Sequence, residues 1–133
     1  MDSSLAFEFV SEIPTENVRV VIPSTVSSRG ELFELYAATL AFPDYFGKNW
    51  DAFIDCLSDL SWIDADEVGV LHDGLPSLPM SEVRVYLQCL EDILDRYRFR
   101  PDQRPRLRIY FTEACRPIVD CLVAGKRGSD APS

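Results

Sequence analysis

The chain has 133 residues, of which 47% are hydrophobic and 26% charged, values typical of one globular domain with a single compact core. Its net charge is −9. That charge disfavours nucleic acid and anionic membranes as partners, and it favours a basic protein or a cation. The sequence has no run of 18 apolar residues, and its N-terminus has neither a basic region nor a long apolar core. We therefore expect a cytoplasmic protein that does not bind a membrane.

Residues 1–16 form an N-terminal extension whose structure the sequence leaves open. Leu5, Phe7 and Phe9 alternate with other residues in the pattern of a short edge strand. A frayed terminus is the alternative. The pattern does not decide whether these residues join a sheet.

From residue 17 onward, β-branched apolar runs alternate with segments of helical periodicity. We predict strands over residues 17–22, 67–71 and 106–111, and helices over residues 29–40, 50–60 and 81–97. The first strand, NVRVVI, is apolar enough to be covered on both faces. Because parallel neighbours require crossover connections, this order predicts an α/β fold: a small three-stranded parallel sheet with crossover helices, plus one edge strand if the N-terminal extension pairs. We place this domain over residues 17–124 and a disordered tail over residues 125–133.

The cysteines and the single histidine predict no metal site and no cofactor. No C-x-x-C pair occurs among the four cysteines, Cys56, Cys89, Cys115 and Cys121. With only one histidine in the chain, few ligands are left for a Cys/His zinc site. Cys56 and Cys89 fall on apolar helix faces, so we expect them to be buried free thiols. The histidine, His72, follows the second predicted strand and is expected in a loop.

The stretch from residue 43 to residue 60, PDYFGKNWDAFIDCLSDL, is the most informative part of the chain. Pro43 and Gly47 indicate a loop, and Asn49 is placed to cap a helix that begins at Trp50. Two apolar stripes occur at helical spacing, Phe53-Cys56-Leu57-Leu60 and Trp50-Phe53-Ile54-Leu57. Periodicity alone does not decide which stripe faces the core.

Acidic side chains follow the same helix. Asp51, Asp55 and Ser58 line up on one face, and Asp59 lies next to it. Like charges four residues apart cost about 0.2–0.5 kcal/mol, and only Asp51 gains from the helix dipole. The pattern therefore favours a binding surface for something positive over a helix selected for stability alone.

Residues 43–57, PDYFGKNWDAFIDCL, resemble the signature of the barstar family, small cytosolic inhibitors of barnase-type secreted ribonucleases. The shared pattern is an aromatic residue, glycine, a variable residue and asparagine, then a helix with Asp-Ala near its start and Asp-Cys-Leu one turn later. The order of elements also fits, from about residue 17 to residue 113. The resemblance implies a barstar-like fold and favours the first apolar stripe as core, with Trp50 and Ile54 outside. A core position for Trp50 is the alternative.

The resemblance also implies a function. The chain would be an intracellular, non-enzymatic immunity protein that occludes the active site of a basic extracellular-type ribonuclease with its acidic loop and helix. Asp55 would take the place of the substrate phosphate, Asp51 would pair with a second basic group, and Tyr45 would pack on the catalytic face. The partner-binding residues implied are Tyr45, Gly47, Asn49, Trp50, Asp51, Ile54, Asp55, Ser58 and Asp59. The family's late acidic contact falls on Asp95 or Arg96, and the register does not decide between them.

Three other functions are compatible with parts of the sequence. The main alternative is a barstar-like adaptor or regulatory domain that binds another basic protein. Catalysis by Asp51 and Asp55 is disfavoured because neighbours on one helix face point the same way, and no base, nucleophile or metal-ligating histidine accompanies them. The arginines between residues 96 and 108 suggest RNA, but on an edge strand and its lead-in loop they also keep that edge soluble.

Overall fold

The computed structural model describes residues 7–12, 18–43 and 49–130, with side chains described to residue 123. Its strands are β1 Glu8–Val10, β2 Val18–Pro23, β3 Glu67–Asp73 and β4 Arg106–Thr112, and its helices are α1 Arg29–Leu40, α2 Trp50–Asp59, α3 Met80–Arg98 and α4 Arg116–Asp130, the last preceded by a 3-10 turn, η1 Glu113–Cys115. The described strands form one parallel sheet in the order β1-β4-β3-β2. The predicted α/β class and parallel sheet are confirmed, and the N-terminal extension does contribute an edge strand.

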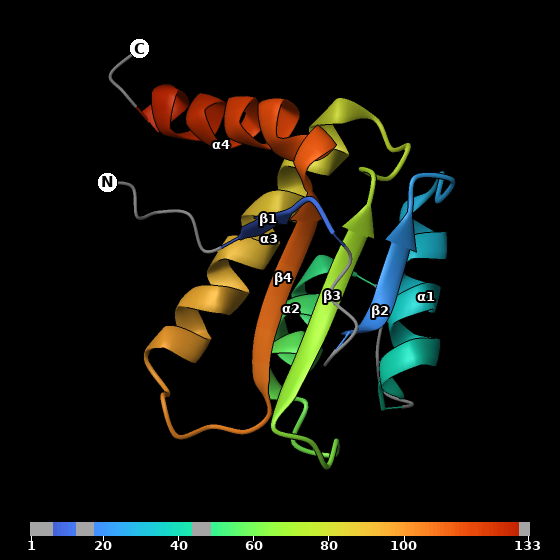
Figure 1. Cartoon of the computed structure of the whole chain (residues 1–133), viewed down its shortest axis with the longest axis vertical. Helices are drawn as coiled ribbons and strands as arrows, with labels where there is room; N and C mark the ends of the chain where they lie inside the picture. The colour runs from blue at the N-terminus through green and yellow to red at the C-terminus, as the bar shows by residue number, and fades with distance from the viewer. Residues whose placement is uncertain (1–6, 13–17, 44–48, 131–133) are drawn as a thin grey trace.

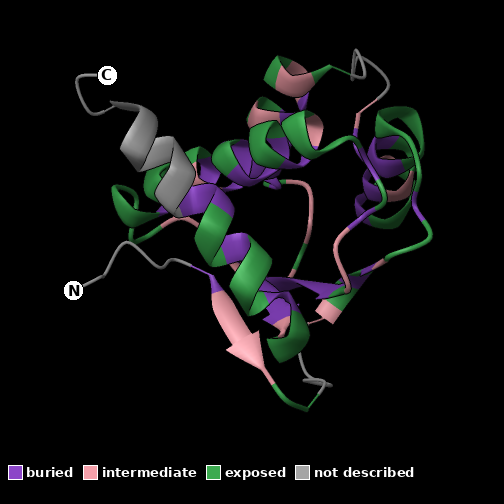
Figure 2. Ribbon diagram, turned by 90° about the horizontal axis from the view of Figure 1, so that it is seen from above, coloured by how far each residue is buried: buried purple, intermediate pink, exposed green. Residues whose placement is uncertain are grey.

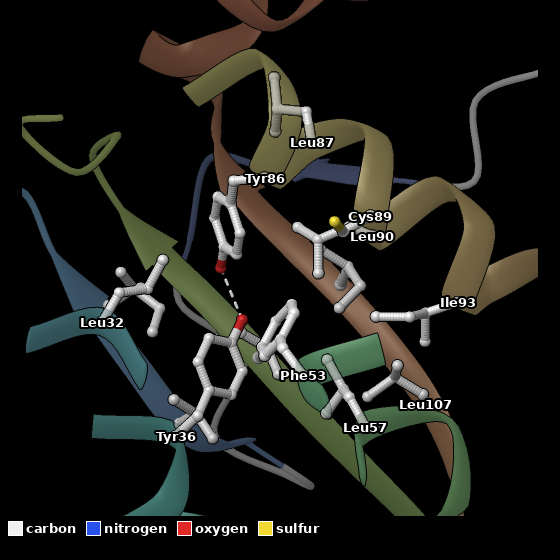
Figure 3. Packing of buried hydrophobic residues seen from close by; sticks show 14 of the residues in the cluster. Leu32, Tyr36, Phe53, Leu57, Tyr86, Leu87, Cys89, Leu90, Ile93 and Leu107 are labelled. Carbon is white, nitrogen blue, oxygen red and sulfur yellow. Dashed lines mark hydrogen bonds between the residues drawn. The ribbon is translucent and has the colours of Figure 1, made fainter. Parts of the chain in front are cut away.

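The helices α1, α2 and α3 lie on one side of the sheet, and α4 runs outward from the upper end of β4 on the β1 side (Figure 1). Viewed from above, the buried residues gather between the sheet and these helices (Figure 2). The core contains tightly packed aromatic rings, for example Tyr36 and Phe53, whose centroids are 4.8 Å apart in an edge-on contact. Leu57 of α2 and Ile93 of α3 extend this core toward β4 (Figure 3).

Local capping sets the ends of α1. The Ser28 hydroxyl accepts a hydrogen bond from the Glu31 N–H at 3.1 Å, and the Glu31 carboxylate accepts one from the Ser27 N–H at 2.8 Å. These reciprocal bonds satisfy N–H groups that a helix start leaves free. At the other end, Ala41 adopts a left-handed conformation (φ 54°) and closes the last turn. The structure confirms the predicted bounds of this helix.

Two expectations about the sheet are wrong. The strand β2 was expected to be covered on both faces, but it is an edge strand in which Val20 and Ile22 are buried and Val21 is 48% exposed. The strand β4 was expected at an edge, but β1 pairs with it and makes it interior. The second error arises because the sequence left the pairing of β1 open, whereas β2 is an edge strand because it pairs with β3 alone among the described strands.

Helix α4 also differs from the sequence-based prediction. Residues 125–130, expected in a disordered tail, continue the helix that begins at Arg116. Val119, Leu122 and Val123 are buried on one side of its first turns, against the remainder of the core. A helix nucleated by this apolar stripe extends into the polar residues that follow, because adding residues to an existing helix costs less than starting one. Residues 131–133 lie outside the described part of the chain.

Candidate functional site

Helix α2 is held at both ends by specific caps. The Ala52 N–H donates to the Asn49 side-chain oxygen at 2.8 Å, as the sequence predicts for an N-cap residue. Leu60 ends the helix in a left-handed conformation (φ 53°), and its N–H donates to the Cys56 carbonyl oxygen. The helix therefore has a defined start and end, which set where the backbone of each surface residue lies.

The inner face of α2 is the stripe that the family resemblance favours. Phe53, Cys56, Leu57 and Leu60 are all buried. The helix packs on α3, where the Tyr97 hydroxyl donates to the Leu57 carbonyl oxygen at 2.8 Å. The side-chain amide of Gln103 donates to the carbonyl oxygens of Ser58 and Asp59 at 2.7 and 3.1 Å. These donors satisfy carbonyl groups at the helix end, where they would otherwise lack partners.

The outer face of α2 carries three exposed carboxylates, those of Asp51, Asp55 and Asp59. We call these three residues the acidic face. The side chain of Asp55 is 76% exposed, so its carboxylate is open to an incoming cation. The residues Asn49 (exposed) and Ile54 (half-buried) lie on the same helix beside them.

Trp50 lies between the acidic face and the core. Its ring is half-buried, and its centroid is 4.9 Å from that of Phe33 and 6.1 Å from that of Tyr86. The sequence placed Trp50 either outside or in the core, and the structure shows an intermediate position in which part of the ring packs on buried aromatics. Such packing fixes the rotamer of the part that stays exposed, and a preorganised aromatic residue suits an interface.

A buried chain of hydrogen bonds runs beneath Trp50. The Tyr36 and Tyr86 hydroxyl oxygens are 2.6 Å apart, and the Tyr86 hydroxyl is 2.7 Å from His72 Nε2 (Figure 3 shows the tyrosine pair). His72 Nδ1 lies 2.9 Å from the Tyr110 carbonyl oxygen, which can only accept. His72 Nδ1 therefore donates, Nε2 accepts from Tyr86, and Tyr86 accepts from Tyr36.

The expectation that His72 lies in a loop is wrong. Strand β3 extends to Asp73, two residues past its predicted end, so His72 is a fully buried strand residue stacked on Phe111. Burial lowers the pKa of His72 to about 4, although its hydrogen bond to the Tyr110 carbonyl acts in the opposite direction. The imidazole is therefore neutral at physiological pH and serves the core.

A basic side chain from α3 contacts the acidic face. The guanidinium Nη1 of Arg96 is 3.5 Å from Asp55 Oδ1, and the Arg96 side chain is 43% exposed. Its neighbour Asp95 pairs instead with Arg98, on the same helix, at 3.1 Å. The late-helix residue next to Asp55 is thus the basic Arg96, a contact that sequence spacing could not establish.

One comparison with known proteins identifies the family. A family model described as Barstar (barnase inhibitor) matches residues 17–112, more than half of the chain. The chain belongs to the barstar family. No curated protein matches it in a sequence search. The match includes α2 and α3, whereas β1 and α4 lie outside it.

Three of the barstar-family positions implied by the sequence need comment. Tyr45 and Gly47 lie outside the described residues. Ser58 was expected to line the contact, but the structure buries it (3% exposed), and its Oγ has no hydrogen-bond partner among the described residues. Helical geometry aligns Ser58 with Asp51, but the segment after α3 covers this end of α2 through Gln103. The side chain of Ser58 is therefore not part of the exposed surface.

The thiols of this barstar-family chain are consistent with structural roles. Cys56, Cys89 and Cys115 are buried and free, as predicted for the first two, and Cys121 is exposed and free. Burial, followed by the charges of Asp55 and Asp59, raises the pKa of the Cys56 thiol. Burial, with smaller contributions from acids nearby, raises the pKa of the Cys89 thiol to about 11. Both thiols are thus protonated and poor nucleophiles at neutral pH.

Among the described residues, no three or more His, Cys, Asp or Glu side chains come together in a way that could hold a metal ion. None of the helices in the same residues has the length and apolar character needed to cross a membrane.

Proposed function

We propose that this barstar-family chain is an intracellular inhibitor of a barnase-type secreted ribonuclease. It acts in the cytoplasm of the cell that makes the nuclease, and it has no catalytic activity of its own. The observation that carries the proposal is the open carboxylate of Asp55, 76% exposed on a capped helix within the part of the chain that matches the family.

The mechanism is occlusion of the nuclease active site. The acidic face presents fixed carboxylates where the nuclease binds substrate phosphates, with Asp55 in the central position and Asp51 beside it. Trp50, held on Phe33, supplies an aromatic anchor, and Asn49, Ile54 and Asp59 complete the surface. By family resemblance, Tyr45 and Gly47 also contact the nuclease. Complementary charge accelerates encounter with a basic protein.

A ribonuclease assay tests this proposal directly. RNA cleavage by each of several small basic ribonucleases, barnase included, is measured with and without an equimolar amount of this protein. We expect one or more enzymes to be silenced stoichiometrically. If every enzyme keeps full activity while another basic protein is bound, the chain is an adaptor of the same fold rather than an inhibitor.

The variant Asp55→Ala should lose most of the inhibition while it remains folded. In the complex, the lost carboxylate leaves basic groups of the nuclease buried without a partner, at a cost on the order of 2–5 kcal/mol in binding free energy, a range based partly on the barnase–barstar pair itself. The matched control is Asp120→Ala, which removes the same charge from an exposed position on α4. Calorimetric affinities for both variants decide the matter: equal affinities would show that the acidic face is not the binding surface.

A further inference from the structure

The ion pair between Asp55 and Arg96 is an unusual feature for a surface that binds basic proteins. Asp55 lies on α2 and Arg96 on α3, so the packing of the two helices sets the contact. It is Arg96's only ion pair with a described residue. Asp55 remains 76% exposed, so Arg96 occupies one side of the carboxylate and leaves the other side open. A cation of a partner can therefore reach Asp55, but it arrives next to a positive charge.

This arrangement has different consequences in the free protein and in a complex. In the free protein, both side chains are substantially solvated, and water screens an exposed pair of this kind. In a complex, a partner cation competes for the same carboxylate while the interface removes water from Arg96. A buried charge that has lost its partner is strongly unfavourable. A tight complex therefore requires a new acceptor for Arg96.

We propose that Arg96 is a specificity-determining residue, and that the cognate partner presents a carboxylate opposite it, beside the cation that meets Asp55. This inference rests on the proposed function. It narrows the partner to a basic ribonuclease whose cationic active site is bordered by an acidic side chain at that position. A ribonuclease with a cation opposite Arg96 is rejected because the two positive charges repel each other. A ribonuclease with an apolar group at that position is rejected because it leaves Arg96 without a partner.

The chain contains a close control for Arg96. Arg98 is also on α3, also exposed, and also paired with an aspartate, but that aspartate is Asp95 and not a member of the acidic face. Substitutions at Arg96 and Arg98 change the net charge equally. If the Arg96 and Arg98 variants differ in affinity, the difference comes from the position of Arg96 beside Asp55 and not from the change in net charge.

The test compares Arg96→Ala, Arg96→Glu, Arg98→Ala and Arg98→Glu with wild type against the same panel of basic ribonucleases, by dissociation constant. Thermal unfolding of each variant first verifies that it folds. For the enzyme that wild type inhibits best, we expect Arg96→Ala to weaken binding by about 30-fold or more, Arg96→Glu to weaken it further, and the Arg98 variants to change it by less than about threefold. For enzymes that wild type binds poorly, we expect Arg96→Ala to strengthen binding.

Each other outcome has a distinct meaning. If Arg96→Glu binds the best-inhibited enzyme as tightly as wild type or more tightly, Arg96 only screens Asp55, and the inference is wrong while the proposed function stands. If the Arg96 and Arg98 variants weaken binding equally, the effect is one of net charge, and the inference is again wrong. If neither wild type nor any variant binds a ribonuclease, the proposed function fails and this inference fails with it.

Discussion

Individual residues in this protein either belong to the core or lie on the surface where a partner can contact them. His72 belongs to the core, and its burial determines its protonation state. Its two ring nitrogens are both hydrogen-bonded, one to Tyr86 and one to the Tyr110 carbonyl. Protonation of Nε2 would make both nitrogens donors, so Tyr86 would have to accept from His72 and donate to Tyr36. The fully buried Tyr36 hydroxyl would then need a new acceptor.

Protein stability should therefore fall as the pH falls from about 6.5 to about 4. The unfolded state binds a proton at its ordinary pKa of about 6.5, whereas the pKa of folded His72 is lowered to about 4. In this window the unfolded state holds more protons, so the free energy of unfolding rises with pH, by about 3 kcal/mol in total. Urea unfolding at a series of pH values measures this slope.

The variant His72→Gln is the control for this pH dependence. It removes the only histidine in the chain, so the slope between pH 5 and 6.5 should largely disappear, even though the variant is less stable at neutral pH. An unchanged slope in His72→Gln would assign the pH dependence to carboxylates instead.

At the scale of elements, local sequence predicted the helix starts well. Ser28 and Asn49 are capping residues that lie close in sequence to the N–H groups from which they accept, so the starts of α1 and α2 could be predicted. The buried stripe of α2 could be predicted as one of two, and the family resemblance chose correctly between them. These features depend on contacts only three or four residues apart.

Features that depend on distant contacts could not be predicted in the same way. Gln103 bonds to the Ser58 carbonyl oxygen from the segment after α3, and the contact of Asp55 with Arg96 comes from the docking of α3. The interior position of β4 comes from its pairing with β1, about 100 residues away in the sequence, where Arg108 also donates to both carboxylate oxygens of Glu8 at 2.8 Å. No periodicity in a single segment contains this information.

The variant Leu57→Ala should destabilise the fold by about 2–5 kcal/mol, because Leu57 is fully buried between α2 and α3 and its loss leaves a cavity. Chemical unfolding measures this loss. Binding at temperatures well below the unfolding transition should fall much less than in Asp55→Ala. If a still-folded Leu57→Ala protein loses as much binding as Asp55→Ala, then Leu57 contributes to binding directly, and the division of α2 into a core face and a binding face is wrong.

At the scale of the whole molecule, the chain is acidic although the segment from residue 96 to residue 108 is rich in arginine. Arginines that could have suggested an RNA site bind within the chain: Arg106 donates to the carbonyl oxygens of Arg100 and Tyr97, and Arg108 bonds to Glu8. Of the arginines near α2, Arg96 contacts the acidic face directly. The chain as a whole carries a net charge of −9, which favours attraction of a basic partner over a distance.

Association with a basic ribonuclease should therefore slow steeply with ionic strength. The Debye length falls from about 10 Å at 0.1 M salt to about 3 Å at 1 M, which removes long-range attraction. We expect stopped-flow association rates to fall by at least about tenfold over this range, while dissociation rates change much less. Association rates that do not depend on salt would rule out electrostatic steering.

The strand order has a consequence for synthesis of the chain on the ribosome. Strand β4 lies between β3 and β1, and the Glu8–Arg108 pair joins residues that are 100 positions apart. A nascent chain therefore displays α2 and its carboxylates long before the strand that completes the sheet has emerged. Because contacts so far apart in sequence form only after a large loop has closed, β1 can pair with β4 only near the end of translation. A message truncated before the codon for Arg106 would yield the whole acidic face without β4, the strand with which both β1 and β3 pair.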